Sequence, residues 1–306
     1  MPDRSPRTST VFLPVVLILI GMASIQTGAA IAKQLFPVVG ATGAATLRLL
    51  FAAIILCVVL RPWRLRTTPA SRRSILVYGI ALAGLNCLFY TSLRTIPLGI
   101  ATALEFAGPL LVALLASRRV VDFLWIGLAV GGLLLLLPLG STSTAIDPVG
   151  AALALAAGSC WALYIVFGRK AGAAHGVQMT AIGVAIAAAC ALPFGLAQAG
   201  AALFTPSILH FAVAVAILST ALPYSLEMVG LSRLPTKTFG TLMSLEPAFG
   251  ALSGLVFLNE QLAPVQWLAI GAIISASVGT TATATRKDEV PHLSDPPTVG
   301  GTLDTM

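Results

Sequence analysis

Two glutamates lie in long apolar stretches of the sequence, each close to a proline. Glu105 stands four residues before Pro109 in LGIATALEFAGPLLVALL, and Glu246 directly precedes Pro247 in TKTFGTLMSLEPAFGALSGLV. A carboxylate in hydrocarbon is costly unless it is protonated, paired or in contact with water. A proline inside a helix leaves one backbone carbonyl without its usual partner. The two stretches therefore indicate helix breaks at Pro109 and Pro247 and a polar pathway across the middle of a membrane.

The chemistry available to these carboxylates is the binding of a proton or of a cationic ligand. Burial favours the protonated form of a carboxyl group, and a nearby cation favours the ionised form. Competition between a proton and a substrate ammonium for Glu105 or Glu246 would suffice to exchange one for the other. The alternative is that each glutamate stays protonated and only ties neighbouring helices together, and Pro247 gives Glu246 a possible local structural role as well.

Arg48 is the candidate partner for a substrate carboxylate, because the planar guanidinium matches a carboxylate in geometry. It lies roughly 12 Å from the outer end of its apolar stretch at 1.5 Å per residue. A standing ion pair with Glu105 is the equally open alternative. Lys33 is expected to be an interfacial cation near the outer mouth, with its charged end extended toward water.

Other polar residues fall at helical spacing within apolar stretches, as a cavity lining would require. Small polar and tyrosine residues in such stretches also serve packing, so both interpretations stay open. The candidates for a cavity lining are Asn86, Tyr90, Tyr224, Gln26 and Thr220. Glu227 lies only about 5 Å from the inner end of its stretch, where an ion pair with Arg233 or Lys237 would form an inner gate.

The composition predicts a polytopic membrane protein. Of the 306 residues, 57% are hydrophobic and 9% are charged, whereas soluble proteins carry about 25% charged residues. Stretches of about 20 apolar residues are long enough to span a bilayer as helices. Ten such spans are predicted near residues 11–32, 40–60, 75–93, 98–116, 122–140, 148–168, 178–199, 208–230, 237–257 and 263–284.

The net charge of +7 follows the predicted topology and does not indicate a nucleic-acid site. With a cytoplasmic N-terminus, the outer connectors carry only Lys33 and Arg94. This is a strong positive-inside bias, so both termini are expected in the cytoplasm. The inner segments carry Arg4, Arg7, Arg61, Arg64, Arg66, Arg72, Arg73, Arg118, Arg119, Arg169, Lys170, Arg233, Lys237, Arg286 and Lys287.

Neither an enzyme nor a metal centre is indicated. The sequence contains no HExxH or GxSxG motif, and its three histidines are scattered. The four cysteines (Cys57, Cys87, Cys160 and Cys190) all fall within predicted spans and lack metal-ligand spacing. We expect no cofactor and no metal.

An internal repeat is visible at an offset of 138 residues. LRTIPLGIATALEFAGPL aligns without gaps with LSRLPTKTFGTLMSLEPA. Because each unit holds five predicted spans, the second must be inverted relative to the first, an arrangement typical of secondary transporters. The predicted organisation is a cytoplasmic tail (1–10), a first five-helix repeat (11–140), an outer connector (141–147), a second five-helix repeat (148–284) and a disordered cytoplasmic tail (285–306).

Several long blocks of the sequence resemble the EamA-type proteins of the drug/metabolite transporter superfamily, and within it the bacterial inner-membrane exporters of threonine and homoserine. They are MASIQTGAAIAKQLFP, RPWRLR, TIPLGIATALEFAGPLLVALLASRRVVDF, AILSTALPYSLEM and RLPTKTFGTLMSLEPA. One departure is that the Gly-Glu pair often found after the fourth span of each repeat is replaced by Asn259-Glu260 and, in the first repeat, by Ser117-Arg118-Arg119.

The resemblance implies an all-α membrane protein of ten helices that exports small amino acids in exchange for protons. Its partners would be the amino acid, protons and the lipid bilayer. The open alternatives are an exporter of another metabolite or drug with the same fold, or an uncoupled facilitator. A small polar cavity would favour the amino-acid exporter, and an enlarged aromatic cavity would favour the alternative cargo.

Overall fold

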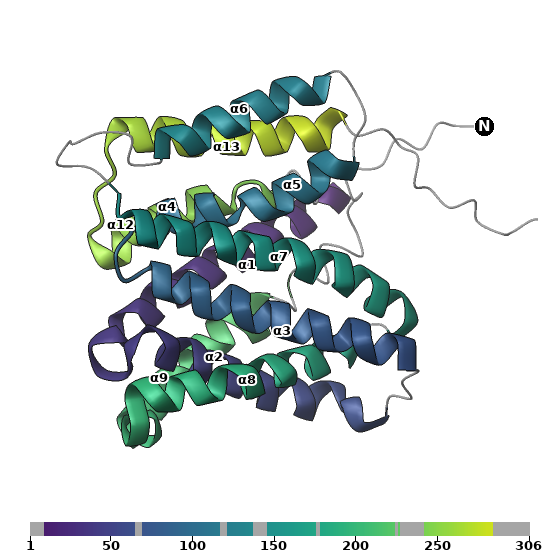
Figure 1. Cartoon of the computed structure of the whole chain (residues 1–306), viewed down its shortest axis with the longest axis vertical. Coiled ribbons are helices and arrows are strands. Elements are labelled where there is room, and N and C mark those ends of the chain that lie inside the picture. Colours follow the sequence, from purple (N-terminus) through teal and green to yellow (C-terminus); the bar gives the residue numbers. More distant parts are fainter. Residues whose placement is uncertain are drawn as a thin grey trace, which may run out of the picture.

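A computed structural model describes residues 9–64, 69–116, 121–136, 146–175, 178–223, 226 and 242–283 (Figure 1). Every regular element in these ranges is helical, as the composition predicts. The N-terminal part contains α1 (Ser9–Gln34), α2 (Phe36–Leu60), η1 (Pro62–Arg64), α3 (Pro69–Ser92), α4 (Leu98–Glu105), α5 (Ala107–Ala116) and α6 (Val121–Leu136). The C-terminal part contains α7 (Pro148–His175), α8 (Gln178–Ala199), η2 (Gly200–Phe204), α9 (Pro206–Ala216), η3 (Ile217–Ala221), α12 (Glu246–Leu258) and α13 (Pro264–Thr283).

Local sequence signals account for several helix ends. Proline is the first residue of α3, α7, α9 and α13, where its missing N–H removes no helical hydrogen bond. Asp147 precedes α7, and its Oδ2 accepts a hydrogen bond of 2.8 Å from the Gly150 amide. At the other end of a helix, Asn259 adopts a left-handed conformation (φ 54°) and closes α12.

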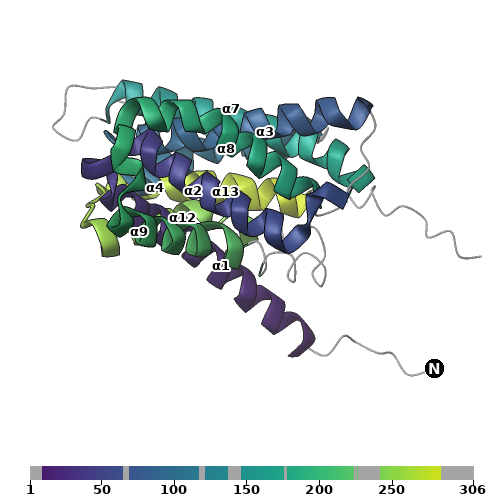
Figure 2. The same cartoon turned by 90° about the horizontal axis from the view of Figure 1, so that it is seen from below.

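Five helices are long and apolar enough to cross a membrane by length and composition, and five shorter apolar segments accompany them. Their outward surfaces are apolar too: Leu115, Phe123 and Leu268 are each more than two-thirds exposed. An apolar exterior on apolar helices is what a lipid environment requires. Figure 2 shows that α2, α3, α7 and α8 run roughly alongside one another, while α1 crosses them obliquely.

The helices pack in pairs drawn from distant parts of the chain. α2 packs on α8, α3 on α7, α4 on α12 and α6 on α13. In Figure 1, α6 and α13 form one side of the molecule, α1, α4, α5, α7 and α12 lie in the middle, and α2, α3, α8 and α9 form the opposite side. The middle group brings the two glutamate-bearing segments together.

The stretch around Glu105, expected as one span over 98–116 with a break at Pro109, is divided at Phe106 into α4 and α5. Pro109 has no N–H to donate to the carbonyl of Glu105, which would be its partner in a continuous helix. This carbonyl lies against Gly158 of α7, so closely that a Cβ at position 158 would collide with it. Gly108 meets the backbone of Gly158 in the same way. Close backbone approach between the broken helix and α7 therefore depends on glycine.

A second break precedes Glu246. Residues 244 and 245 form a turn, in which the Leu245 amide donates to the carbonyl of Leu242 (3.0 Å). The Ala248 amide in turn donates to the carbonyl of Leu245 (2.9 Å), a tight bond to the third residue back. α12 then begins at Glu246, with Pro247 in its first turn. Both glutamates thus lie at helix ends within the molecule.

Candidate functional site

A cavity of about 240 Å³ lies between the helices that carry the two glutamates. It is smaller than typical pockets for drug-sized ligands, which span about 300–1,000 Å³. Side chains from α1, α2, α3, α4, α7, η3, α12 and the segment leading into α12 surround it. They are Ile25, Gln26, Ala29, Arg48, Leu82, Leu85, Asn86, Phe89, Glu105, Trp161, Tyr164, Ser219, Met243 and Glu246.

Glu105 and Glu246 both face this cavity, each with only 9% of its surface exposed. Glu105 is the last residue of α4, and Glu246 is the first of α12. Glu105 lies within electrostatic reach of both Glu246 and Arg48. The two buried carboxyl groups can bind a proton or an ammonium. The guanidinium beside them can bind a carboxylate of the same ligand.

Arg48 reaches the cavity from α2. Its Nη1 donates to the Tyr90 hydroxyl (3.4 Å), and its Nη2 donates to the Ser219 carbonyl (3.2 Å). The guanidinium carbon lies 5.7 Å from the centre of the Tyr90 ring, a distance at which a cation is attracted to an aromatic face. Tyr90 itself is fully buried and not among the residues that line the cavity. Its place is behind Arg48, which it orients.

The π-helical turn η3 supplies backbone acceptors near the cavity. The carbonyl of Leu218 accepts a hydrogen bond from Ser24 Oγ (2.6 Å), and the carbonyl of Ser219 accepts the one from Arg48. π turns of this kind often occur at functional sites because they displace backbone groups from the regular ladder. Gly28 of α1 packs directly on Ser219. The neighbouring Thr220 is buried but does not line the cavity.

Gln26 of α1 lies opposite Glu246. Its Nε2 donates to Glu246 Oε1 at 3.2 Å, although the two residues are 220 positions apart in the chain. Asn86 of α3 also faces the cavity, and its Nδ2 donates to the carbonyl of Leu82 one turn earlier (2.9 Å). The structure thus brings Gln26, Arg48, Asn86, Glu105 and Glu246 to a single cavity.

Two aromatic residues of α7 were missed by the sequence analysis. Trp161 and Tyr164 line the cavity three positions apart, which places them on one helix face. Trp161 packs edge-on against Phe106 at the helix break (5.8 Å between ring centres), and Tyr164 stacks on Tyr78 (4.7 Å). Their spacing beside the small residues of α7 was the available signal. The expected site residues Tyr224, Glu227, Arg233 and Lys237 lie outside the described residues.

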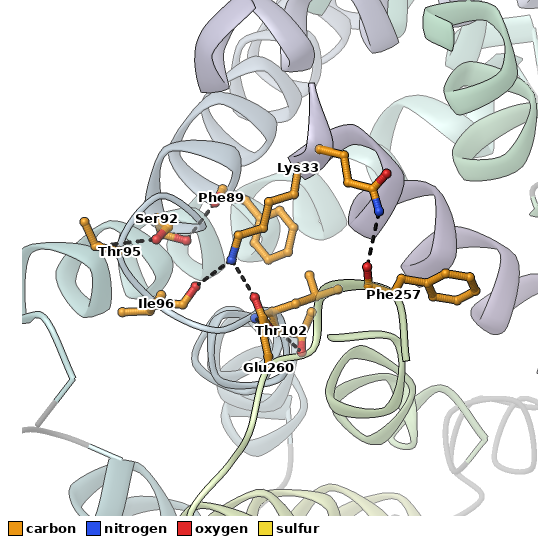
Figure 3. A network of polar contacts seen from close by, with 10 residues as sticks. Lys33, Phe89, Ser92, Thr95, Ile96, Thr102, Phe257 and Glu260 are labelled. Carbon is orange, nitrogen blue, oxygen red and sulfur yellow. Dashed lines mark hydrogen bonds and ion pairs between the residues drawn. The ribbon is translucent and has the colours of Figure 1, made fainter. Parts of the chain in front are cut away.

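At one end of the bundle, Lys33 forms an ion pair with Glu260 (Nζ to Oε1, 2.6 Å; Figure 3). The other oxygen of Glu260 accepts a hydrogen bond of 2.6 Å from the amide of Leu98, the first residue of α4. Lys33 Nζ also donates to the Ile96 carbonyl (3.4 Å). Lys33 was expected as an interfacial cation near the outer mouth, and the structure gives it a partly buried counterion, Glu260.

This cluster ties three segments together. Lys33 closes the end of α1, Glu260 follows α12, and Leu98 begins α4. Next to it, Gln34 Nε2 donates to the Phe257 carbonyl (3.2 Å), a further link between α1 and α12. A carboxylate at a helix N-terminus satisfies an unpaired amide and interacts favourably with the helix dipole. Glu260 therefore does two tasks, capping α4 and pairing with Lys33. We refer to Lys33, Glu260 and the Leu98 amide as the clamp.

Comparison with known proteins identifies the family. The profile of the EamA-like transporter family matches residues 148–282. The chain is 56% identical over 289 residues to the threonine/homoserine exporter RhtA of Escherichia coli (strain K12), covering 94% of this chain and 98% of that protein. The chain belongs to the EamA-like transporter family. This EamA-like transporter is also 56% identical over 286 residues to the threonine/homoserine exporter RhtA of Salmonella typhimurium (strain LT2), with 94% and 97% covered.

More distant relatives are consistent with this family. An uncharacterized transporter of Bacillus subtilis, YwfM, is 26% identical over 231 residues (72% of this chain and 77% of that protein). A solved structure matches the fold with a TM-score of 0.58 at 17% identity, covering 92% of this chain and 99% of the other. The relatives are transporters and not enzymes. Together with the apolar helices, they make this EamA-like transporter a multi-pass protein of the bacterial inner membrane.

Proposed function

We propose that this protein exports small amino acids of the threonine/homoserine type in exchange for protons, by alternating access. The observation that carries the proposal is that two buried carboxyl groups and a guanidinium share one small cavity. This donor and acceptor set matches an amino acid, which presents an ammonium and a carboxylate. The 56% identity to proteins named threonine/homoserine exporter favours the same cargo class here.

In this mechanism Glu105 and Glu246 exchange a proton for the substrate ammonium. An ammonium nearby favours the ionised carboxylate, and its departure favours reprotonation. Arg48 receives the substrate carboxylate, which would draw the guanidinium from the Ser219 carbonyl toward the cavity. Because proton and ammonium compete for the same oxygens, movement of one down its gradient drives the other in the opposite direction.

The proposed architecture is ten membrane-spanning helices in two inverted five-helix repeats, over 11–140 and 148–284, with both termini in the cytoplasm. Two helix pairs support it, because α2 packs on α8 and α6 on α13, and the members of each pair occupy corresponding places in the two halves. The helix breaks at Phe106 and at 244–245 correspond as well at the offset of 138 residues. Glu227, Arg233 and Lys237 remain the proposed inner gate.

The clamp fits the role of an outer gate in that topology. The end of α1, the start of α4 and the end of α12 all lie on the outer side, and the clamp joins them. Opening toward the outside would then require the Lys33–Glu260 ion pair to separate.

The deciding experiment is efflux of labelled threonine from proteoliposomes with and without an acidic exterior, for the native protein, Glu105→Gln and Glu246→Gln. Asp147→Asn is the control, since Asp147 is partly exposed and does not line the cavity, and asparagine also caps helices well. We expect acidification to accelerate efflux by the native protein and the control. Gradient-driven efflux should be lost in both glutamate variants, with threonine exchange retained.

Other outcomes assign the alternatives. Native flux that ignores the gradient would make the protein an uncoupled facilitator. No threonine flux from the native protein, with flux of another metabolite or drug, would reassign the cargo.

A further inference from the structure

The amide of Gln26 is an unusual group for the wall of this cavity. Gln26 is 2% exposed, yet its side chain borders the cavity between α1 and α12. Its Nε2 is directed to Glu246 Oε1 at 3.2 Å. When Glu246 is ionised, as it is when it binds an ammonium, its oxygens only accept hydrogen bonds, so the amide presents Nε2 to it. The carbonyl end, Oε1, is left for another donor.

Among the described residues, none donates a hydrogen bond to Gln26 Oε1. An acceptor removed from water without a donor destabilises the protein, so buried side-chain acceptors are nearly always satisfied. Of the residues that line the cavity, Asn86 donates to the Leu82 carbonyl and Ser219 Oγ to the Val215 carbonyl, while Ile25, Ala29 and Met243 offer no side-chain N–H or O–H. The geometry favours a donor supplied by the cavity's occupant.

An amino acid of the proposed class brings two kinds of donor, its ammonium and its side-chain hydroxyl. The ammonium interacts more strongly with ionised carboxylates than with a neutral amide, because charge-assisted hydrogen bonds are about twice as strong. Glu105 and Glu246 therefore compete best for the ammonium. This leaves the hydroxyl for the amide oxygen.

We propose that Gln26 Oε1 accepts the hydrogen bond of the substrate hydroxyl and makes this hydroxyl a requirement for binding. The inference rests on the proposed function, because it takes the cargo to be a small amino acid. It assigns a specificity-determining residue and restricts the cargo class to hydroxy amino acids. A cavity with apolar walls alone rejects an analogue that differs by one hydroxyl only weakly, whereas an unpaired buried acceptor rejects the analogue without the hydroxyl strongly.

Valine is the matched test ligand for threonine, because it replaces the hydroxyl by a methyl group. Norvaline is the corresponding ligand for homoserine. The experiment measures the affinity of the purified native protein for all four amino acids by calorimetry, and then their competition with labelled threonine in proteoliposomes. We expect the native protein to prefer each hydroxy amino acid over its analogue by at least about a hundredfold.

The variant Gln26→Met keeps the length of the side chain and removes both polar groups. We expect its preference for threonine over valine to fall by about ten- to a hundredfold. Thr46→Val is the control, since Thr46 is buried, donates to the Ala191 carbonyl (2.9 Å) and does not line the cavity. Its preference should remain native. A merely structural role of Gln26 would lower stability or flux without changing the ratio of threonine to valine.

The outcomes separate this inference from the proposed function. Native protein that binds valine as tightly as threonine overturns the role of Gln26, even if Gln26→Met does not fold. An unchanged ratio in a folded Gln26→Met also overturns it while leaving amino-acid export intact. Hydroxyl-dependent binding without gradient-driven flux supports the inference and removes the proton coupling. Native protein that neither binds nor moves threonine overturns both.

Discussion

Lys33 Nζ lies 2.6 Å from Glu260 Oε1, joining the end of α1 to the segment after α12 across 227 positions of the chain. The two side chains are 22% and 13% exposed, so the pair is only partly screened by solvent. Glu260 is further constrained by the Leu98 amide (2.6 Å). The strength of this pair bears on how readily the outer side opens.

Separating the pair should destabilise the closed outer side. Lys33→Met leaves Glu260 without its cation, and loss of a hydrogen bond to a charged group costs about 1.5–3 kcal/mol. We expect a lower thermal unfolding midpoint in detergent and faster entry of external threonine into proteoliposomes. Glu260→Gln should act in the same direction but keep its acceptor for Leu98. If the double variant is no different from Lys33→Met, the two residues act as a pair; additive effects would contradict this.

The close contact between the broken helix and α7 should not accept a methyl group. Gly158→Ala places a Cβ against the carbonyl of Glu105, which is backbone and cannot turn away. Overpacking of this kind costs about 1–3 kcal/mol. We expect a lower unfolding midpoint and reduced threonine flux. Gly127→Ala on α6 is the control, since nothing lies within 4 Å of that site. Equal effects of the two substitutions would contradict the tight contact.

Arg48→Lys should weaken recognition of the substrate carboxylate. Lysine keeps the charge but loses the planar fork that contacts the Tyr90 hydroxyl and the Ser219 carbonyl. We expect the KM for threonine to rise about tenfold, with a smaller change in maximal flux. Threoninol, which lacks the carboxylate, distinguishes binding from structure. Its affinity should be the same for the native protein and the variant, and a parallel loss would assign Arg48 a structural role instead.

Asp147 should make the start of α7 sensitive to acid. Two hydrogen bonds, one from the Thr95 side chain and one from the Gly150 amide, lower the pKa of the Asp147 carboxyl below its ordinary value of 3.8. A carboxyl group whose pKa is lower in the folded state stabilises that state above the ordinary value, and this contribution is lost as pH falls through the folded value. The unfolding midpoint of the native protein should therefore drop more steeply than that of Asp147→Asn as pH falls below about 4. Parallel pH curves for the two proteins would count against this.

The sequence by itself determined the class of the protein and its family. Composition sets the class because apolar side chains on nearly every helix face leave only lipid as a solvent. The long matched blocks indicate the family. The 56% identity to a transporter over 94% of the chain confirms this assignment. The unusual positions of Glu105 and Glu246 were also visible, because a carboxylate in an apolar stretch is a local feature.

Tertiary structure alone decided which polar residues meet. Gln26 and Glu246 are 220 positions apart, and Lys33 and Glu260 are 227 apart, with nothing in the sequence to pair them. Helices that are apolar on all sides carry no periodic signal of which face meets which neighbour. A break near Pro109 was expected from the sequence, but the contact of the Glu105 carbonyl with Gly158 of α7 was decided only by the fold. Such pairings depend on which helices become neighbours in the folded protein. A local pattern of residues does not specify these neighbours.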